Sequence, residues 1–239
     1  MSRNSLKQVL SGWDVFFIAV GQIIGAGVIA LTGIAIGMTG PSVILAYLLS
    51  AVLVLIVTIL IMMAGSVLPA VGAYYSWCSR LSGGWIGSIV LSLILLASVS
   101  LSLYGSSFGL YLSPLFPILT ANQWGIFVIV LLFGANLLGL QLAAKVQFAL
   151  VAILVSALAI YAGFAMPKVE LSLLEPWLPE GIIGFVTAVF LLKFATSGAY
   201  MIVGLSGEMK NPRRVIPIVM TTATIVVAVL YAFVALASV

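Results

Sequence analysis

Two short stretches of this apolar sequence have the composition to bind a charged ligand through backbone atoms. The first, Gly21–Val28, reads Gly-Gln-Ile-Ile-Gly-Ala-Gly-Val, and the second, Lys193–Tyr200, reads Lys-Phe-Ala-Thr-Ser-Gly-Ala-Tyr. Glycine weakens a helix by about 1 kcal/mol relative to alanine. Where a membrane helix breaks, the free N–H groups at the start of its second half can hold a carboxylate. The chemistry that these stretches suggest is therefore ligand binding.

Each stretch also has an ordinary structural explanation. Gly21 and Gly25, like Gly33 and Gly37, have the small-residue spacing that lets membrane helices pack closely. The threonine and serine of the second stretch can bond to carbonyls of their own helix. The pairing favours two breaks, because the stretches lie in the first and sixth apolar segments, which run in opposite directions. Paired breaks of this kind are typical of inverted repeats that bind their ligand at mid-membrane.

Lys193 is the charged residue for which the apolar pattern offers no simple explanation. It follows Ile182 by roughly 16 Å along a helix, near the centre of a hydrocarbon core about 30 Å thick. No aspartate or glutamate stands near mid-segment to pair with it. One interpretation is that its side chain points into a watery vestibule and has no role. The other is an amine that carries or senses a coupling proton, or offers its charge to an acidic substrate side chain.

The elements that carry these stretches belong to a helical membrane protein. Of 239 residues, 64% are hydrophobic and only 6% are charged, whereas soluble domains are about 25% charged. This composition excludes an ordinary soluble domain and disorder. With one cysteine, Cys78, and no histidine, we expect no disulfide framework, metal site, cofactor or enzyme activity. A net charge of +4 forms no basic stripe for nucleic acid.

Apolar runs of about 20 residues recur along the chain, as transmembrane helices require. The alternating short segments of a β-barrel are missing from the sequence. We predict seven transmembrane helices, at Trp13–Met38, Ser42–Ala64, Gly84–Leu112, Gln123–Leu140, Gln147–Met166, Ile182–Ser206 and Ile216–Val239.

The charges outside these runs predict the orientation of the chain. One side of an alternating topology holds seven basic residues: Arg3, Lys7, Arg80, Lys145, Lys210, Arg213 and Arg214. The other side holds Lys168, together with Glu170, Glu175 and Glu180. Because basic loops stay in the cytoplasm, we expect a multi-pass protein of the plasma membrane with a cytoplasmic N-terminus.

Several motifs resemble segments of the amino acid–polyamine–organocation superfamily of transporters. Gly21–Val28 resembles the break in the first helix, and Leu68–Tyr75 resembles the cytoplasmic segment after the second helix. Glu208–Pro217, which contains Asn-Pro-Arg-Arg, resembles the loop after the sixth helix and is the most specific match. Asn136–Gly139 and the following Lys145–Gln147 fit the junction of the fourth and fifth helices. The similarity extends over the whole chain.

The resemblance implies a fold of two inverted five-helix repeats, with helices 1 and 6 broken at mid-membrane. The chain is then a single transmembrane domain, 1–239, with the first repeat at 13–166 and two helices of the second at 182–239. The eighth helix, which in relatives closes part of the ion or proton site, is missing, so the chain looks truncated or is one part of a split protein. The implied function is secondary active transport of amino acids or related amines by alternating access, as an antiporter or proton symporter.

The resemblance also implies which residues bind the substrate. The substrate carboxylate is expected at the N–H groups of the first break, those of Gly25, Ala26, Gly27 and Val28. The ammonium group is expected at carbonyls of both breaks, those of Ile23, Ile24, Ala195 and Thr196, with Ser197 and Gly198 completing the second break. Phe194 stands where relatives often place an aromatic gate, although it could equally be a packing residue. Tyr104 and Tyr200 are further candidates for the gate or vestibule.

Other functions stay open because helices are missing. A non-transporting subunit, or half of a split transporter, is the main alternative, and the missing helices would then be a separate partner chain. The remaining expected partners are the substrate, the lipid bilayer and a coupling proton or ion. A channel is harder to exclude, but two breaks favour alternating access. A retinal protein or ordinary receptor fits poorly, since the last run has no lysine and the N-terminus is expected inside. The Asn211–Arg214 loop is either a gate contact or an orientation signal.

Overall fold

The computed structural model describes residues 8–25, 27–168 and 175–238. These residues are almost entirely helical and form no strand, apart from isolated bridges such as Leu10 with Met209. They form two compact units, Met1–Val71 with Gln147–Val239, and Gly72–Val146. Arg3, Lys7, Glu170 and the predicted end of the last segment at Val239 lie outside the described residues.

The first half of the first unit consists of three helices and one short 3-10 turn: α1 (Gly12–Ile23), α2 (Gly27–Thr39), η1 (Gly40–Ser42) and α3 (Val43–Val67). A capping box starts α1, because the Ser11 N–H donates to the Asp14 carboxylate at 2.8 Å and the Asp14 N–H returns to the Ser11 hydroxyl at 3.3 Å. The turn into α3 uses Gly40 at φ 60° and then Pro41. Glycine adopts this left-handed conformation without penalty, so the chain can reverse sharply.

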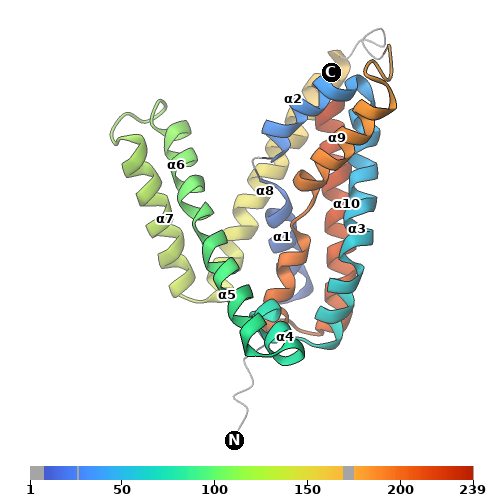
Figure 1. Cartoon of the computed structure of the whole chain (residues 1–239). Helices are drawn as coiled ribbons and strands as arrows, with labels where there is room; N and C mark the ends of the chain where they lie inside the picture. Colours follow the sequence, from blue (N-terminus) through green and yellow to red (C-terminus); the bar gives the residue numbers. More distant parts are fainter. Residues whose placement is uncertain (1–7, 26, 169–174, 239) are drawn as a thin grey trace, which may run out of the picture. The chain divides into compact units, whose positions relative to one another are not determined.

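The second half of this unit begins within α8 (Leu140–Ala165) and continues through η2 (Met166–Lys168), α9 (Gly181–Thr196), η4 (Ala199–Gly204), η5 (Ser206–Glu208) and α10 (Pro212–Leu236). Helices α1, α3, α9 and α10 lie side by side (Figure 1). Their shared core includes the fully buried Tyr47, Leu192, Ile216, Met220 and Tyr231. Most of the remaining surface of the long helices is apolar and exposed, as expected for a face in contact with lipid.

The second unit contains α4 (Ala73–Ser82), α5 (Gly84–Ser98), α6 (Ser100–Leu112) and α7 (Ala121–Leu137). Glycines let α6 and α7 approach backbone to backbone. A Cβ on Gly109 would overlap the Ala121 carbonyl, and a Cβ on Gly125 would lie 2.6 Å from the Gly105 carbonyl oxygen. This is the close small-residue packing typical of membrane helices.

The all-helical membrane class is confirmed. In the described part of the chain, five helical segments are long and apolar enough to cross a bilayer: Leu31–Val67, Gly84–Leu112, Leu140–Ala165, Gly181–Gly204 and Pro212–Leu236. Gly12–Ile23 and Ala121–Leu137 are apolar but shorter. Seven crossings and an inverted repeat remain predictions. Helix α4 was not expected from the sequence and occupies the loop predicted after the second segment.

Candidate functional site

The first predicted break is present between α1 and α2. Helix α1 ends at Ile23, and Ile24 leaves the helix with φ −77° and ψ 100° while its N–H still bonds to the Val20 carbonyl at 2.8 Å. Helix α2 begins at Gly27, and Ala26 lies outside the described residues. The last carbonyls of one helix and the first N–H groups of the next have no partner within their own helix. Hydrogen-bond donors and acceptors of the backbone are therefore both present at this break.

The second predicted break follows α9. The helix ends at Thr196, Ser197 is extended with φ −85° and ψ 159°, and Gly198 has φ 142°. The Thr196 hydroxyl does bond back to the Leu192 carbonyl at 3.0 Å, as the ordinary explanation expected. The helix nevertheless ends at Thr196. Gly198 follows two residues later with a positive φ, a conformation that only glycine adopts readily.

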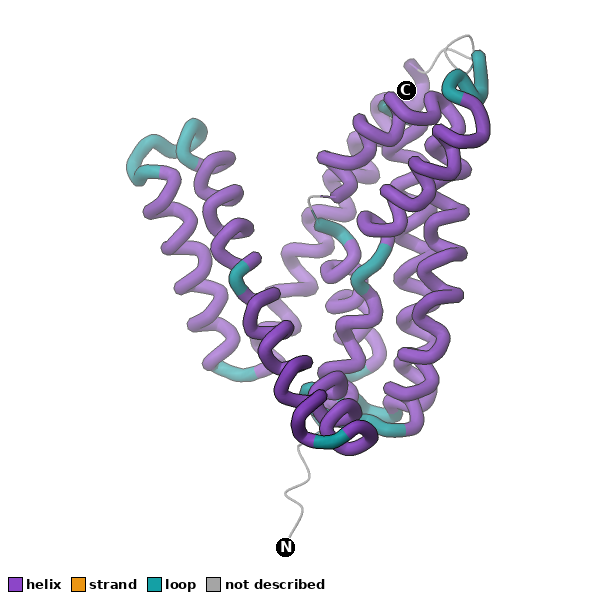
Figure 2. Tube along the Cα trace, viewed as in Figure 1, coloured by secondary structure: helices purple, strands orange, loops and turns teal. Residues whose placement is uncertain are grey.

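The two breaks lie against each other within the first unit (Figure 2). A Cβ on Gly198 would overlap the Gln22 carbonyl oxygen and lie 3.0 Å from the Ile23 nitrogen. A Cβ on Gly27 would lie 3.2 Å from the Ala195 Cα. Glycine is therefore required at position 198 and makes a tight contact at position 27, and the structure brings together two stretches that are distant in sequence.

Access to this contact differs among the predicted binding residues. Gly25 is exposed, and a Cβ added to it would meet no atom of the described chain within 4 Å. Ile23, Ile24 and Val28 are at most 5% exposed. On the other side, Ala195 and Thr196 are also buried, at 4% and 1% exposed. A ligand approaching the first break would therefore meet Gly25 first.

A buried tyrosine supports the end of α1. The Tyr231 hydroxyl of α10 donates to the Ile23 carbonyl at 3.4 Å. Its ring packs edge-on against Tyr47 of α3, with centroids 5.4 Å apart. The Tyr47 hydroxyl is 2.6 Å from the hydroxyl of Thr32 on α2. This chain of contacts joins both halves of the broken first segment to α3 and α10.

A second hydroxyl pair lies beside the other break. Ser50 of α3 is 3.1 Å from the Thr196 hydroxyl, and both residues are buried. Neither Ser50 nor the Tyr47–Tyr231 pair was among the residues expected from the sequence. The available signal was the presence of hydroxyl groups inside apolar segments, because a buried hydroxyl normally needs a hydrogen-bond partner.

Lys193 lines a pocket beside the second break, to which Ser197 also contributes. The pocket has a volume of about 390 Å³ and lies between α3 and the α9–η4 segment, where Thr58, Phe190 and Tyr200 also line it. Lys193 is half-buried and forms no ion pair with any residue that the structure describes. The pocket thus combines the Lys193 amine with hydroxyl groups and aromatic rings.

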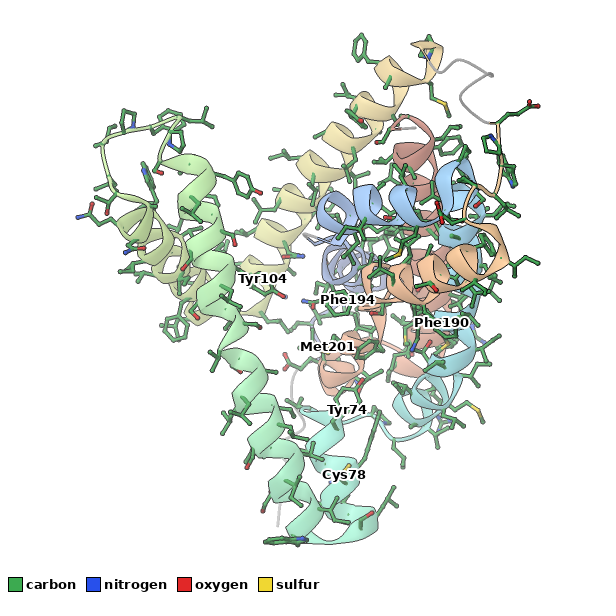
Figure 3. The ribbon with its side chains drawn as sticks, turned by 45° about the horizontal axis from the view of Figure 1, so that its top comes forward. Tyr74, Cys78, Tyr104, Phe190, Phe194 and Met201 are labelled. Carbon is green, nitrogen blue, oxygen red and sulfur yellow. The ribbon has the colours of Figure 1, made fainter. Side chains whose placement is uncertain are left out.

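The predicted aromatic candidates are less closely connected to the breaks. Phe194 lines the Lys193 pocket and is 77% exposed, so the described residues do not bury it as a packing residue. Phe190 and Phe194 both come from α9 (Figure 3). Tyr104 lies on α6 of the second unit and is 64% exposed. Their roles as gates remain predictions.

Within the first unit, the start of the 68–75 motif is hydrogen-bonded to the segment just before the 208–217 motif. The Ala70 N–H donates to the Ser206 hydroxyl at 2.9 Å, and that hydroxyl donates to the Ala70 carbonyl at 3.0 Å. Asn211 has φ 55° and precedes Pro212, the first residue of α10. Asparagine tolerates the left-handed conformation, and proline suits the first position of a helix. The sequence Asn211-Pro212 is therefore suited to the start of a helix.

Comparisons with known proteins agree with this architecture. A family model described as amino acid permease matches residues 10–239. The vacuolar cationic amino acid transporter 8 of Arabidopsis thaliana is 26% identical over 99% of this chain and 43% of its own length. A branched-chain amino acid permease of Lactococcus lactis subsp. cremoris is 27% identical over 96% of this chain and 55% of its own length. A serine/threonine exchanger of Bacillus subtilis is 26% identical, covering 97% and 54%.

The chain spans about half the length of these curated relatives. The family comprises transporters, and enzymes are not among the matches described above. The match from residue 10 to residue 239, together with the long apolar helices, confirms the resemblance drawn from the sequence motifs. The chain is a multi-pass membrane protein that belongs to the amino acid permease family.

Proposed function

We propose that the chain is part of a secondary active transporter that binds an amino acid, or a related amine, at the paired breaks. The observation that carries this proposal is the contact of Gly198 with the end of α1 at Gln22 and Ile23. At this contact, backbone groups at the ends of two broken helices lie side by side. Several relatives are named for the transport of amino acids, which supports this class of substrate.

The polarity of the helix ends suits a zwitterion. The start of α2 is the positive end of a helix dipole, so the N–H groups of Gly25, Ala26, Gly27 and Val28 would hold the carboxylate. The ends of α1 and α9 are negative, so their last carbonyls would hold the ammonium group. These carbonyls belong to Ile23, Ile24, Ala195 and Thr196, and Ser197 and Gly198 complete the second break. The substrate would be recognised through its carboxylate and ammonium groups. These contacts do not select a particular substrate side chain.

The membrane arrangement belongs to the same proposal. Residues 13–166 would form one inverted repeat and 182–239 the start of the other, in a plasma-membrane protein with a cytoplasmic N-terminus. Alternating access would open the paired breaks to each side in turn.

A binding screen of amino acids and amines on the purified chain tests the site. Gly25→Leu should abolish binding, because its side chain would fill the space that the ligand carboxylate needs. The fold should tolerate it, since a Cβ there meets no described atom within 4 Å. Gly33→Leu is the matched control on α2, where the added Cβ also meets no described atom within that distance. Equal binding by both variants would refute the site.

Lys193 is the proposed coupling group, because it is the half-buried amine of a pocket that adjoins the second break. Amino acid uptake into proteoliposomes, measured against pH, tests this role. Lys193→Met should remove the pH dependence. Lys193→Arg should keep a fixed positive charge in the pocket, because arginine stays protonated. An unchanged rate and pH profile in Lys193→Met would contradict the assignment without affecting the binding test above.

A further inference from the structure

Helices α1 and α10 begin side by side at one end of the first unit. The Leu10 N–H donates to the Glu208 carbonyl at 3.1 Å, and the Lys210 N–H donates to the Leu10 carbonyl at 2.9 Å. Helix α1 begins two residues after Leu10, at Gly12, and α10 begins two residues after Lys210, at Pro212. The backbone pairing therefore fixes the first turns of the two helices at the same level.

A groove of about 440 Å³ runs between these first turns. Ligand pockets commonly have volumes of about 300–1,000 Å³. Phe16 lines the groove from α1, while Val215, Ile218, Val219 and Thr222 line it from α10. Their spacing of three, four and seven residues places them on one face of the helix. The strip is roughly 10 Å long at 1.5 Å per residue, and its surface is almost entirely apolar.

A neighbouring part of α1 is already packed against α8. Phe17 packs edge-on against Phe148 of α8, with ring centroids 4.4 Å apart. Trp13, in the first turn of α1, is 73% exposed and lines the groove. Tryptophan prefers the boundary between hydrocarbon and headgroups. The groove thus begins at a residue suited to the membrane interface.

Arg214 adds a positive charge at the same end of the groove. It lines the groove, is exposed, and has no ion pair within the described ranges. Asp14, the acidic residue in the first turn of α1, is engaged elsewhere. Its carboxylate accepts the Ser11 N–H at 2.8 Å and the Ser11 hydroxyl at 2.6 Å. The guanidinium is therefore available for an external anion.

We propose that this groove binds an anionic phospholipid. The phosphate lies at Arg214, whose guanidinium can form paired hydrogen bonds with phosphate oxygens. One acyl chain lies along Phe16, Ile218 and Val219, and the Trp13 indole lies at headgroup level. Charge complementarity and the apolar strip together favour a lipid over two other occupants of the groove. Binding of free phosphate would not use the apolar strip, and packing of an apolar helix would not use the arginine. In the orientation proposed above, the lipid belongs to the cytoplasmic leaflet.

Native mass spectrometry of the full chain, released from micelles with equal amounts of phosphatidylglycerol and phosphatidylcholine of the same acyl chains, tests the proposal. The wild type should retain phosphatidylglycerol preferentially. Arg214→Gln should reduce this preference about fivefold, the effect of one basic residue near a lipid surface. Arg213→Gln is the matched charge control. Arg213 does not line the groove, although it lines a neighbouring pocket together with Arg214, and its replacement should change the preference less than twofold.

A second pair of variants tests the apolar strip. Ile218→Trp should fill the groove and reduce retention of both lipids, whereas Ile225→Trp, on an exposed part of α10 that does not line the groove, should not. Both positions are exposed, at 60% and 47%, so the fold should tolerate the larger ring. Absence of retained lipid, equal retention of the two lipids, or equal effects of the two arginine variants would overturn the proposal. Displacement of the lipid by millimolar inorganic phosphate would indicate a simple anion site and would also overturn it.

Discussion

Replacing Gly198 by alanine is expected to destabilise the first unit by about 2–4 kcal/mol, with two separable causes. Gly198 has φ 142°, and a residue with a side chain in such a conformation carries a strain of about 1–3 kcal/mol. The new Cβ would also overlap the Gln22 carbonyl oxygen and lie 3.0 Å from the Ile23 nitrogen. Overpacking a tight contact adds about 1–3 kcal/mol, part of which is relieved when the backbone shifts.

The free energy of unfolding, measured by titrating the purified chain from mild detergent into SDS, tests this prediction. Gly204→Ala is the matched control, because Gly204 lies in the adjoining η4 segment and its added Cβ meets no described atom within 4 Å. Its unfolding free energy should change by less than about 0.5 kcal/mol, as for ordinary surface substitutions. The shift of α1 in Gly198→Ala should also weaken amino acid binding.

The result that would refute this reasoning is an unfolding free energy for Gly198→Ala equal to that of Gly204→Ala. Such a result would mean that the two breaks do not touch in the native protein. It would then remove the main support for a shared binding site. A destabilised Gly198→Ala protein that binds amino acids as the wild type does would keep the contact but separate it from recognition.

Three further predictions concern contacts elsewhere in the fold. Tyr231→Phe should lower the unfolding free energy by only about 0.6 kcal/mol, the average for hydrogen bonds in membrane helices, and a loss above about 2 kcal/mol would mean that the ring contact with Tyr47 was disturbed as well. Gly109→Ala should separate α6 from α7 and increase proteolysis of the loop between them, whereas Gly134→Ala, where the added Cβ meets no described atom within 4 Å, should not; equal cleavage would contradict the close packing. Ser11→Ala should remove the α1 capping box and cost about 1 kcal/mol in SDS titration, and no change would show that the cap contributes little.

The breaks could be predicted from the sequence because their cause is local. Glycine weakens a helix wherever it stands, so Gly25, Gly27 and Gly198 marked positions where the helices end or restart. The membrane class and the family motifs were likewise visible, since they depend on composition and short-range order. The support of the Ile23 carbonyl by Tyr231 was not predictable in the same way. Residues 208 positions apart in the chain meet there, and only packing decides which hydroxyl reaches which carbonyl.

Helix α4 is a further element that could not be predicted from the sequence. The segment from Ala73 to Ser82 is short and only partly apolar, and its start follows Gly72, which has φ 59°. A pattern of apolar runs identifies spans of membrane thickness but passes over an amphipathic helix of this length. The Lys193 pocket also depends on α3, which contributes residues such as Thr58 from a distant part of the sequence.

The pairing of Leu10 with Glu208 and Lys210 restricts how the first unit can change shape. Two backbone hydrogen bonds connect the start of α1 to the segment that leads into α10. A motion that swings α1 outward by itself must break both, at a cost of about 1–3 kcal/mol in total. A motion that carries the first turns of α1 and α10 together keeps both bonds intact. The first turns of these two helices are therefore expected to move as one rigid body, with bending concentrated at the break after Ile23.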